Sequence, residues 1–193
     1  MTIRWSLDKN IRNGNSLISG TDEELEKYFG KNFRNKKPFN WQEEFAEVFK
    51  QGGFDVIIGN PPYIFARGGN FDDNEKKYYA DNYKKLQQYQ LNTFLLFIEK
   101  AYDLLKKNGS FGFIVPNNWL TINSFSKLRE FLLKNTADLK IINAVESVFN
   151  QASVDTCLLL FRKEKPTEVE VGELLIGESP ILSKHSTEKF YKN

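Results

Sequence analysis

Four consecutive residues, Asn60, Pro61, Pro62 and Tyr63, carry the groups in this sequence that are best suited to chemistry. The two prolines fix their φ angles and lack an N–H, so the loop is stiff and presents carbonyl acceptors. Asn60 adds a side-chain carbonyl, and Tyr63 adds a flat aromatic face. Two converging acceptors suit an –NH2 group, because accepting both of its hydrogens localises the nitrogen lone pair as the nitrogen becomes tetrahedral. The loop therefore predicts a site that activates an amino or amide nitrogen toward a reactive electrophile, such as a methyl group on a sulfonium.

The segment before this loop indicates where the site would lie. Residues 54–59 read FDVIIG, a run of apolar and β-branched residues that is typical of a strand buried in a parallel sheet. Ligands of open parallel sheets bind beyond the carboxyl ends of the strands, which is where residues 60–63 fall. A proline pair alone would be interpreted as a rigid turn. An asparagine, two prolines and a tyrosine directly after a buried strand instead favour a functional site.

The remaining pattern predicts an α/β protein in which helices alternate with strands. Thr21 and Glu24 have the spacing of a capping box, Gly109 is expected to end the longest helix, and Ser124 is expected to cap the last one. The expected helices are 21–29, 41–50, 91–109 and 124–135, and the expected strands are 13–20, 54–59, 110–116, 139–146 and 153–163.

Three segments fall outside this pattern. Residues 66–90 carry too many charges for a core and are interpreted as an excursion over the site. Residues after Lys165 lose the periodicity and are interpreted as a linker. The segment KNFRNKK at 31–37 holds four positive charges and no acid. It is either a solvated loop or a loop that faces phosphates.

Composition excludes several classes of site. The chain of 193 residues has a net charge of +2, which neither requires nor excludes a polyanionic partner. Cys157 and His185 are the only cysteine and the only histidine, so an intrachain disulfide, a zinc site and a Cys–His pair all lack ligands. Cys157 lies in an apolar run and is expected to be a buried, inert thiol. No apolar run reaches membrane-spanning length and no signal peptide is evident, so we expect a cytoplasmic protein with no metal.

The ordered motifs resemble a known family. NPPY after DVIIG is similar to the catalytic motif of N6-adenine DNA methyltransferases whose cofactor motif lies upstream. The wider series NWQEEFAEVFKQGGFDVIIGNPPYI, LNTFLLFIEKAYDLLKKNGSFGFIVPNNWL, KLREFLLKN and VFNQASVDTCLLLFRK resembles the methylase part of Eco57I-like type IIG restriction-modification enzymes, over residues 10–165. The resemblance implies a site-specific enzyme that binds double-stranded DNA and transfers a methyl group from S-adenosylmethionine to N6 of a flipped-out adenine.

Roles for the base-binding residues follow from this resemblance. Asn60 through its side chain and Pro61 through its carbonyl would hold N6, with Pro62 as part of the same motif. Tyr63 would stack on the flipped adenine, and Phe149 would pack against its other side. For Phe149 a place in the core is the alternative, because a phenylalanine at a strand end is usually packed.

Cofactor contacts are implied for four residues. GNSL at 14–17 resembles the motif in which a short polar side chain meets the cofactor adenine, and Asn15 stands where many relatives carry Asp. Asn60 would face the cofactor from the catalytic loop. Asn92 and Phe94 fall in a helix that lines the cofactor pocket in the family, although a place in the helix core is equally expected for Phe94.

The resemblance also implies an incomplete Rossmann-like S-adenosylmethionine-dependent methyltransferase fold. The family's first strands and glycine-rich cofactor loop would precede residue 14 and are not found in this sequence. We therefore expect residues 1–165 to form a partial catalytic domain and 166–193 to lead toward a target-recognition region. The strand at 54–59 would then be an exposed apolar edge that favours self-association, and the isolated chain would be inactive.

Two alternatives remain at this point. Protein glutamine methyltransferases share the NPPY motif, since a glutamine amide also presents –NH2. A non-catalytic DNA-binding remnant of a methyltransferase is the other. The long insertion after Tyr63 and the VFNQASV segment favour the DNA enzymes.

Overall fold

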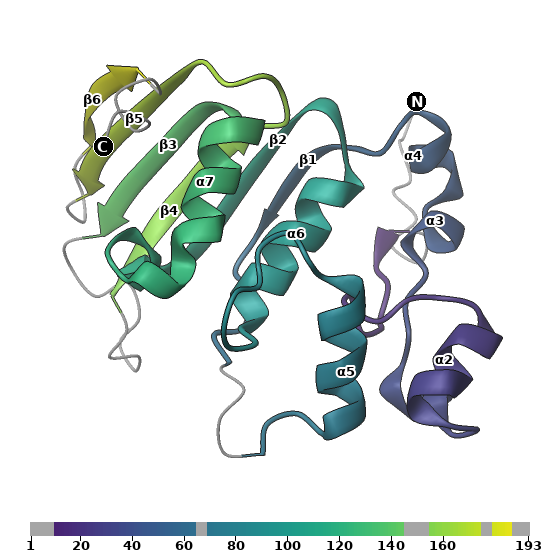
Figure 1. Cartoon of the computed structure of the whole chain (residues 1–193). Helices are drawn as coiled ribbons and strands as arrows, with labels where there is room; N and C mark the ends of the chain where they lie inside the picture. The colour runs from purple at the N-terminus through teal and green to yellow at the C-terminus, as the bar shows by residue number, and fades with distance from the viewer. Residues whose placement is uncertain (1–9, 65–68, 145–154, 175–178, 187–193) are drawn as a thin grey trace, which may run out of the picture.

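The computed structural model describes residues 10–64, 69–144, 155–174 and 179–186. Within these residues the chain forms one six-stranded mixed sheet with helices packed on it (Figure 1). The strands are β1 Phe54–Gly59, β2 Leu105–Pro116, β3 Ala137–Ala144, β4 Thr156–Arg162, β5 Glu168–Leu174 and β6 Ile181–Ser186. The helices are α2 Asp22–Phe29, α3 Trp41–Glu44, α4 Ala46–Lys50, α5 Asp73–Asn82, α6 Thr93–Leu104 and α7 Ser126–Asn135, with 3-10 turns η1 Phe33–Lys36, η2 Asn117–Leu120 and η3 Asn123–Phe125.

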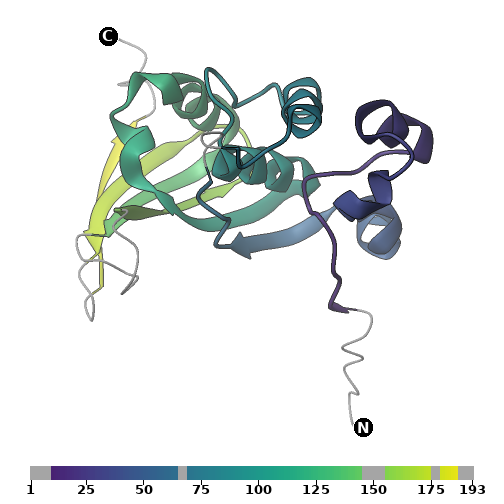
Figure 2. The ribbon, with the colours of Figure 1, turned by 90° about the horizontal axis from the view of Figure 1, so that it is seen from below.

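The strand order is β1-β2-β4-β3-β5-β6. β1 pairs parallel with β2, and β4 lies antiparallel between β2 and β3, so β1, β2 and β3 all point the same way. Figures 1 and 2 place α6 and α7 on one face of this sheet. The carboxyl ends of β1, β2 and β3 therefore meet at one edge. At that edge Asn117 Nδ2 donates to Asn143 Oδ1 at 2.9 Å.

The main core lies between the sheet and the helices α6 and α7. Phe111 of β2 and Phe161 of β4 stack with their ring centroids 4.3 Å apart, and Leu159 is fully buried beside them. From the helices, Ile98 and Leu128 are also fully buried. Each such side chain contributes about 1.5–3 kcal/mol by leaving water, so this core fixes the strands that carry the site.

A second core contradicts the interpretation of residues 66–90 as a polar excursion. Tyr78 and Tyr79 lie on α5, and Tyr83 directly follows it. All three are buried, in one cluster with Leu17 and Ile18. The hydroxyl of Tyr78 donates to the Ser19 carbonyl at 2.7 Å, and that of Tyr83 to the Leu17 carbonyl at 2.6 Å. A tyrosine can bury its ring when its hydroxyl finds a partner, so a segment with many charges still supplies a core face.

Three expected elements differ in their bounds. Residues 13–20 form no strand, and only an isolated bridge joins Asn15 to Pro38. The helix expected at 41–50 is broken at Phe45 into α3 and α4. The helix expected to continue to Gly109 ends at Leu104, where β2 begins. Gly53 fits this junction because its φ is +122° and a Cβ there would lie 2.4 Å from the Leu104 carbonyl oxygen.

The residues after 165 were expected to form a linker without secondary structure, but two segments of them are strands, β5 and β6. β5 pairs parallel with β3, and β6 pairs antiparallel with β5. The alternating sequence EVEV at 168–171 places Val169 in the core, and Glu170 forms an ion pair with Lys140 at 2.5 Å. Cross-strand charge pairs let acidic residues occupy a strand that is half exposed.

The strand at 54–59 is not buried in the sheet as its apolar run predicted, but forms the exposed edge that the resemblance implied. Among the described strands β1 lies at one edge of the sheet, and the side chains of Val56 and Ile58 are 58% and 79% exposed. Two of the four cations in the basic segment 31–37 form ion pairs with acids. Arg34 contacts Asp22 at 2.5 Å and Lys36 contacts Asp72 at 2.6 Å, which supports the interpretation of a solvated loop.

Candidate active site

The loop after β1 holds its polar groups at the carboxyl edge of the sheet. Asn60 is exposed, whereas Pro61 is buried and Tyr63 is half buried. The Tyr63 hydroxyl lies 2.9 Å from Asn60 Oδ1 and 3.0 Å from the Ile114 carbonyl oxygen on β2. In the described part of the chain no group donates to the Pro61 carbonyl. Asn60 and Pro61 thus keep acceptor capacity for a ligand.

Tyr63 joins the loop to the core. Its ring packs against the core cluster that includes Cys157, and burial raises the pKa of its hydroxyl to about 12. The hydroxyl therefore stays protonated near neutral pH and acts as a donor. Its single hydrogen is shared between Asn60 Oδ1 and the Ile114 carbonyl oxygen, so Tyr63 ties the Asn60 amide to β2 and orients it before any ligand arrives.

Thr93, at the start of α6, holds the other end of the loop. Its Oγ1 donates to the Pro62 carbonyl and accepts from the Ile64 N–H at 2.9 Å. The Thr93 N–H donates to the Ile64 carbonyl at 3.1 Å. Thr93 is only 3% exposed, so these bonds are shielded from water. Sequence reasoning missed this residue, because a threonine directly after the N-cap Asn92 looks like an ordinary helix start.

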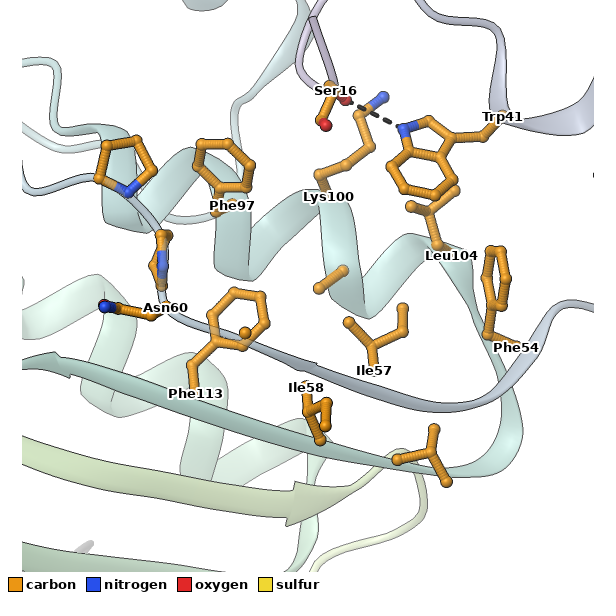
Figure 3. Close-up of a pocket in the computed structure, with 15 residues that line it drawn as sticks. Ser16, Trp41, Phe54, Ile57, Ile58, Asn60, Phe97, Lys100, Leu104 and Phe113 are labelled. Atoms are coloured by element: carbon orange, nitrogen blue, oxygen red, sulfur yellow. Dashed lines mark hydrogen bonds between the residues drawn. The ribbon is translucent and has the colours of Figure 1, made fainter. Parts of the chain in front are cut away.

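A pocket of about 550 Å³ lies beside Asn60, between β1 and α6 (Figure 3). Phe97 and Lys100 extend from α6 toward the side on which Ser16 lies. The Ser16 carbonyl accepts from Trp41 Nε1 at 3.0 Å, which fixes this wall. The pocket is lined by Ser16, Trp41, Phe54, Val56, Ile57, Ile58, Gly59, Asn60, Pro61, Pro62, Phe97, Lys100, Ala101, Leu104 and Phe113.

Lys100 is the cation of this pocket. Its Nζ lies 3.4 Å from Ser19 Oγ and 5.4 Å from the centroid of the Tyr83 ring. Burial lowers the pKa of this ammonium group, because the charged form loses hydration. A ligand with a negative charge would offset that loss.

The predicted cofactor residues are only partly brought together. Asn15 is half buried and its Oδ1 accepts from the Leu17 N–H at 3.1 Å, while its neighbour Ser16 lines the pocket. Asn92 caps α6 and Phe94 is fully buried in the core, and neither lines the pocket beside Asn60. One turn further along α6, Phe97 does line it. Its position three residues after Phe94 is the signal that could have identified it.

The remaining predictions concern Phe149, Cys157, metal ligands and membrane spans. Phe149 lies outside the described residues. Cys157 is fully buried, and burial raises the pKa of its thiol to about 12, so the prediction of an inert thiol agrees with its environment. Among the described residues no group of three His, Cys, Asp or Glu side chains could hold a metal ion. Their helices include none that is long and apolar enough to cross a membrane.

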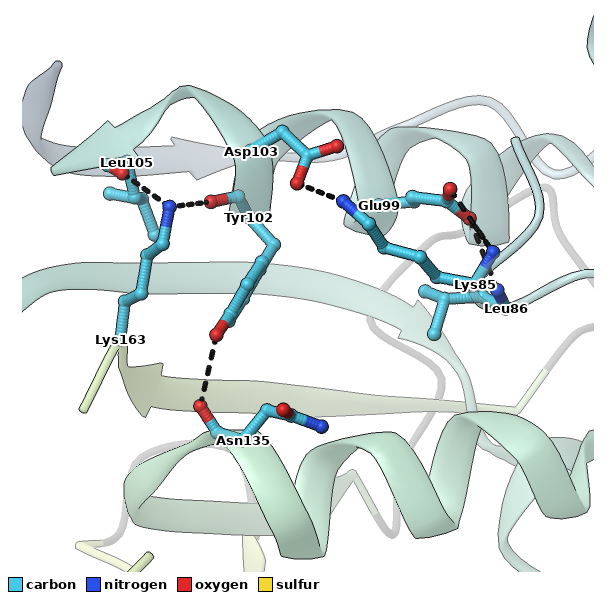
Figure 4. A network of polar contacts seen from close by, with 8 residues as sticks. All are labelled: Lys85, Leu86, Glu99, Tyr102, Asp103, Leu105, Asn135 and Lys163. Carbon is cyan, nitrogen blue, oxygen red and sulfur yellow. Dashed lines mark hydrogen bonds and ion pairs between the residues drawn. The ribbon is translucent and has the colours of Figure 1, made fainter. Parts of the chain in front are cut away.

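A polar network stabilises the helix behind the site (Figure 4). Buried Glu99 of α6 accepts the backbone N–H groups of Lys85 and Leu86 at 3.1 to 3.2 Å. At the end of α6, Lys163 Nζ donates to the carbonyls of Tyr102 and Leu105, both at 2.7 Å. These bonds fix the position of α6, and with it Thr93, Phe97 and Lys100.

Comparison with known proteins agrees with this geometry. The profile of the Eco57I restriction-modification methylase family matches residues 4–149. The chain belongs to this family. The type II restriction enzyme and methyltransferase RM.Eco57I of Escherichia coli is 36% identical over 165 residues, which cover 82% of this chain and 15% of that protein. The type II methyltransferase M.HincII of Haemophilus influenzae is 33% identical over 152 residues, which cover 76% of this chain and 30% of that protein. This member of the Eco57I family thus spans less than a third of either relative.

Solved structures define the fold of this Eco57I family member. A Listeria monocytogenes protein described as a class I S-adenosylmethionine-dependent methyltransferase aligns with a TM-score of 0.51 and 23% identity, over 63% of this chain and 37% of that chain. The type IIG restriction endonuclease BpuSI aligns with a TM-score of 0.57 and 21% identity, over 74% of this chain and 20% of that chain. The fold is that of the class I methyltransferases.

Proposed function

We propose that this chain is the catalytic part of a DNA methyltransferase that transfers a methyl group to N6 of a flipped-out adenine in a restriction-modification system. The observation that carries the proposal is the loop after β1. It holds an exposed Asn60 amide, oriented by Tyr63, beside a pocket at the carboxyl edge of a class I methyltransferase sheet. Membership of the Eco57I family supports the same reaction.

The chain's own residues would act on the amino group of the base. The carbonyl oxygen of Asn60 has two lone pairs, of which Tyr63 uses one. The second lone pair and the Pro61 carbonyl would accept the two N6 hydrogens. These bonds strengthen as N6 becomes tetrahedral and lose nothing to reorganisation, because Tyr63 and Thr93 already fix the loop.

The pocket beside Asn60 fits S-adenosylmethionine, which supplies an electrophilic methyl group when it is bound. Its volume of about 550 Å³ falls within the range of roughly 300–1,000 Å³ that is usual for such ligands. Phe97 offers an aromatic wall, Lys100 an ammonium group for a carboxylate, and Ser16 a polar contact. Asn15, which precedes Ser16, stays a proposed contact of the same cofactor. We assign Phe97, rather than Phe94 or Asn92, as the contact from α6.

Stacking of the flipped base is proposed for Tyr63 and Phe149. Tyr63 is half buried, so one part of its ring packs on the core and the rest is open. Base–aromatic stacking contributes roughly 1–3 kcal/mol per base, which offsets much of the cost of flipping.

Because the isolated chain is expected to be inactive, the test uses the full-length gene in which this chain is encoded, expressed in a bacterial host that lacks adenine methylation. Sequencing of host DNA should reveal N6-methyladenine at one defined sequence. Asn60→Ala should lower the methylation rate about 10²–10³-fold, because one preorganised acceptor is lost. Asn123→Ala, at an exposed position in η3, is the matched control and should methylate normally. Unmodified host DNA alongside methylation of a glutamine in a release factor would favour the protein glutamine methyltransferases instead.

We also propose that this protein works on cytoplasmic double-stranded DNA and self-associates through β1. Exposed apolar side chains on an unprotected strand edge favour pairing with another strand. Ile58→Lys should then convert the chain to a monomer in sedimentation experiments. Ile181→Lys, on β6 at the opposite edge of the described sheet, should leave the association intact. A monomeric unmodified chain would contradict this part of the proposal.

A further inference from the structure

A second pocket, of about 490 Å³, lies at the start of α6. It shares no lining residue with the pocket beside Asn60. Its floor is apolar, from Leu95 and Phe125, and Tyr89 on its wall is 77% exposed. The pocket is lined by Gln88, Tyr89, Gln90, Asn92, Leu95, Asn118, Ile122, Ser124 and Phe125.

Two polar groups in the walls of this pocket lack partners. Asn92 is only 2% exposed, and its Oδ1 accepts from the Phe94 N–H at 3.3 Å as the cap of α6. Its Nδ2 is buried and has no hydrogen-bond partner within the described structure. The same holds for Oδ1 of Asn118, which follows β2. A buried donor or acceptor without a partner destabilises the fold, so native proteins keep such groups where a ligand or water satisfies them.

The walls of this pocket are fixed by their own hydrogen bonds. Gln87 bonds both the N–H and the carbonyl of Asn92 at 3.3 Å. Gln88 Oε1 accepts from Ser126 Oγ at 3.0 Å and from the Lys127 N–H at 3.3 Å, which ties the segment to α7. These bonds hold Asn92 in place, and Asn118 is held through its carbonyl, which accepts from the Ile122 N–H at 3.1 Å.

We infer that this pocket binds a single nucleobase, with Asn92 Nδ2 donating to a ring acceptor and Asn118 Oδ1 accepting from an N–H or amino group. A planar base offers both kinds of group on its edges, and its faces suit the apolar floor and the Tyr89 ring. The inference rests on the proposed function, which brings DNA and an adenine-containing cofactor to this chain. Asn92 directly precedes Thr93, which bonds the catalytic loop, so the pocket and that loop are both anchored at the start of α6.

The charge of the lining favours an uncharged ring over a phosphate. Its residues are neutral, with amide, hydroxyl and apolar side chains and no lysine or arginine. The base is one of the DNA, because the proposed function places the cofactor in the pocket beside Asn60, and a cofactor probe tests this choice.

The experiment titrates the isolated chain with nucleosides and follows the side-chain NH2 resonances of Asn92 by NMR. Thymidine and deoxycytidine represent DNA bases, and S-adenosylhomocysteine represents the cofactor. We expect a saturable shift of the Asn92 signals with at least one of the two DNA nucleosides. A response to S-adenosylhomocysteine alone would overturn the inference, because the pocket would then belong to the cofactor.

Two variants test the contacts. Asn92→Asp keeps the oxygen that caps α6 but replaces the unpaired donor with an acceptor, so backbone shifts of Leu95 and Phe125 should report about tenfold weaker binding. Asn118→Ala removes the acceptor without breaking a hydrogen bond of the described fold and should weaken binding similarly. Asn123→Asp makes the same chemical change outside the lining and should bind normally.

Failure of this inference is distinguishable from failure of the proposed function. No shift at Asn92 with any probe, or equal affinity for the unmodified chain, Asn92→Asp and Asn118→Ala, would overturn the nucleobase pocket. Methylation of adenine in the host would still support the proposed function in that case, because that assay depends on Asn60.

Discussion

The hydroxyl oxygen of Tyr63 lies 2.9 Å from Asn60 Oδ1 and 3.0 Å from the carbonyl oxygen of Ile114. One hydroxyl thus links the amide of the catalytic loop to the neighbouring strand β2. Tyr63 has a role beyond the flat face that a stacked base would use, because its hydroxyl also orients the acceptor.

Removing that hydroxyl should separate the two roles. Tyr63→Phe keeps the ring but leaves Asn60 free to rotate, so we predict roughly a tenfold lower rate of methyl transfer in single-turnover assays, the value of one hydrogen bond. Binding of DNA should change little. Tyr102→Phe is the matched control, since the Tyr102 hydroxyl donates to the Asn135 carbonyl at 3.2 Å and, among the described residues, to no group of the catalytic loop. An unchanged rate in Tyr63→Phe would mean that the prolines alone orient Asn60.

Thr93 makes a second prediction about the same loop. Thr93→Val has the same shape but loses the hydroxyl that bonds Pro62 and Ile64, so the loop should shift relative to the cofactor pocket. Misplacement of a reacting group by about 1 Å can cost about 10²-fold in rate. We expect kcat to fall by that order while KM for DNA stays similar. Thr93→Ser retains the hydroxyl and should restore most of the rate. Equal losses in both variants would point to packing of the methyl group instead.

The sequence predicted the part of the site that is built from consecutive residues. The strand at 54–59 and the loop at 60–63 are contiguous, so their order alone predicted the position of Asn60. The bond between Thr93 and Pro62 spans 31 residues and needs the fold to bring them together. Phe97 could not be separated from Phe94 by periodicity alone, because both lie on apolar positions of α6 and only packing decides which one faces the pocket.

Amino-acid composition gave the wrong prediction for segments whose polar side chains form hydrogen bonds inside the fold. The charged segment around α5 supplies core tyrosines, because their hydroxyls reach the carbonyls of Leu17 and Ser19. Those carbonyls lie about 60 residues upstream, in a segment expected to be a strand, so no local pattern reveals the pairing. The alternation at 168–171 was a local signal, and its acidic residues obscured it.

Cys157 should be unreactive in the folded chain. Its thiol is fully buried and its pKa is raised to about 12, so almost no thiolate exists at pH 8. We predict that a chromogenic disulfide reagent labels no thiol in the native chain and one thiol per chain after unfolding in guanidinium. Because Cys157 is the only cysteine, the count is unambiguous. Rapid labelling without denaturant would mean that β4 opens readily.

Glu99 should make stability depend on pH in the direction opposite to most carboxylates. Burial raises its pKa above the ordinary value of 4.5, although the N–H groups of Lys85 and Leu86 partly oppose the shift. Between 4.5 and the raised pKa, the folded chain binds a proton that the unfolded chain does not. The stabilisation is therefore complete below pH 4.5 and is lost as the pH rises through the folded pKa.

Glu99→Gln removes this titration. The unfolding free energy of the unmodified chain minus that of Glu99→Gln should grow as the pH falls from 7 toward 4.5, by at most about 1.4 kcal/mol per pH unit. Urea titrations across this range measure the difference, and the backbone bonds that glutamine alters add only a constant offset. Glu130→Gln is the matched control, since the ion pair with Lys134 lowers the pKa of this exposed carboxyl and its small contribution fades as the pH falls. A difference between the unmodified chain and Glu99→Gln that shrinks on acidification would mean that the two backbone N–H groups outweigh burial at Glu99.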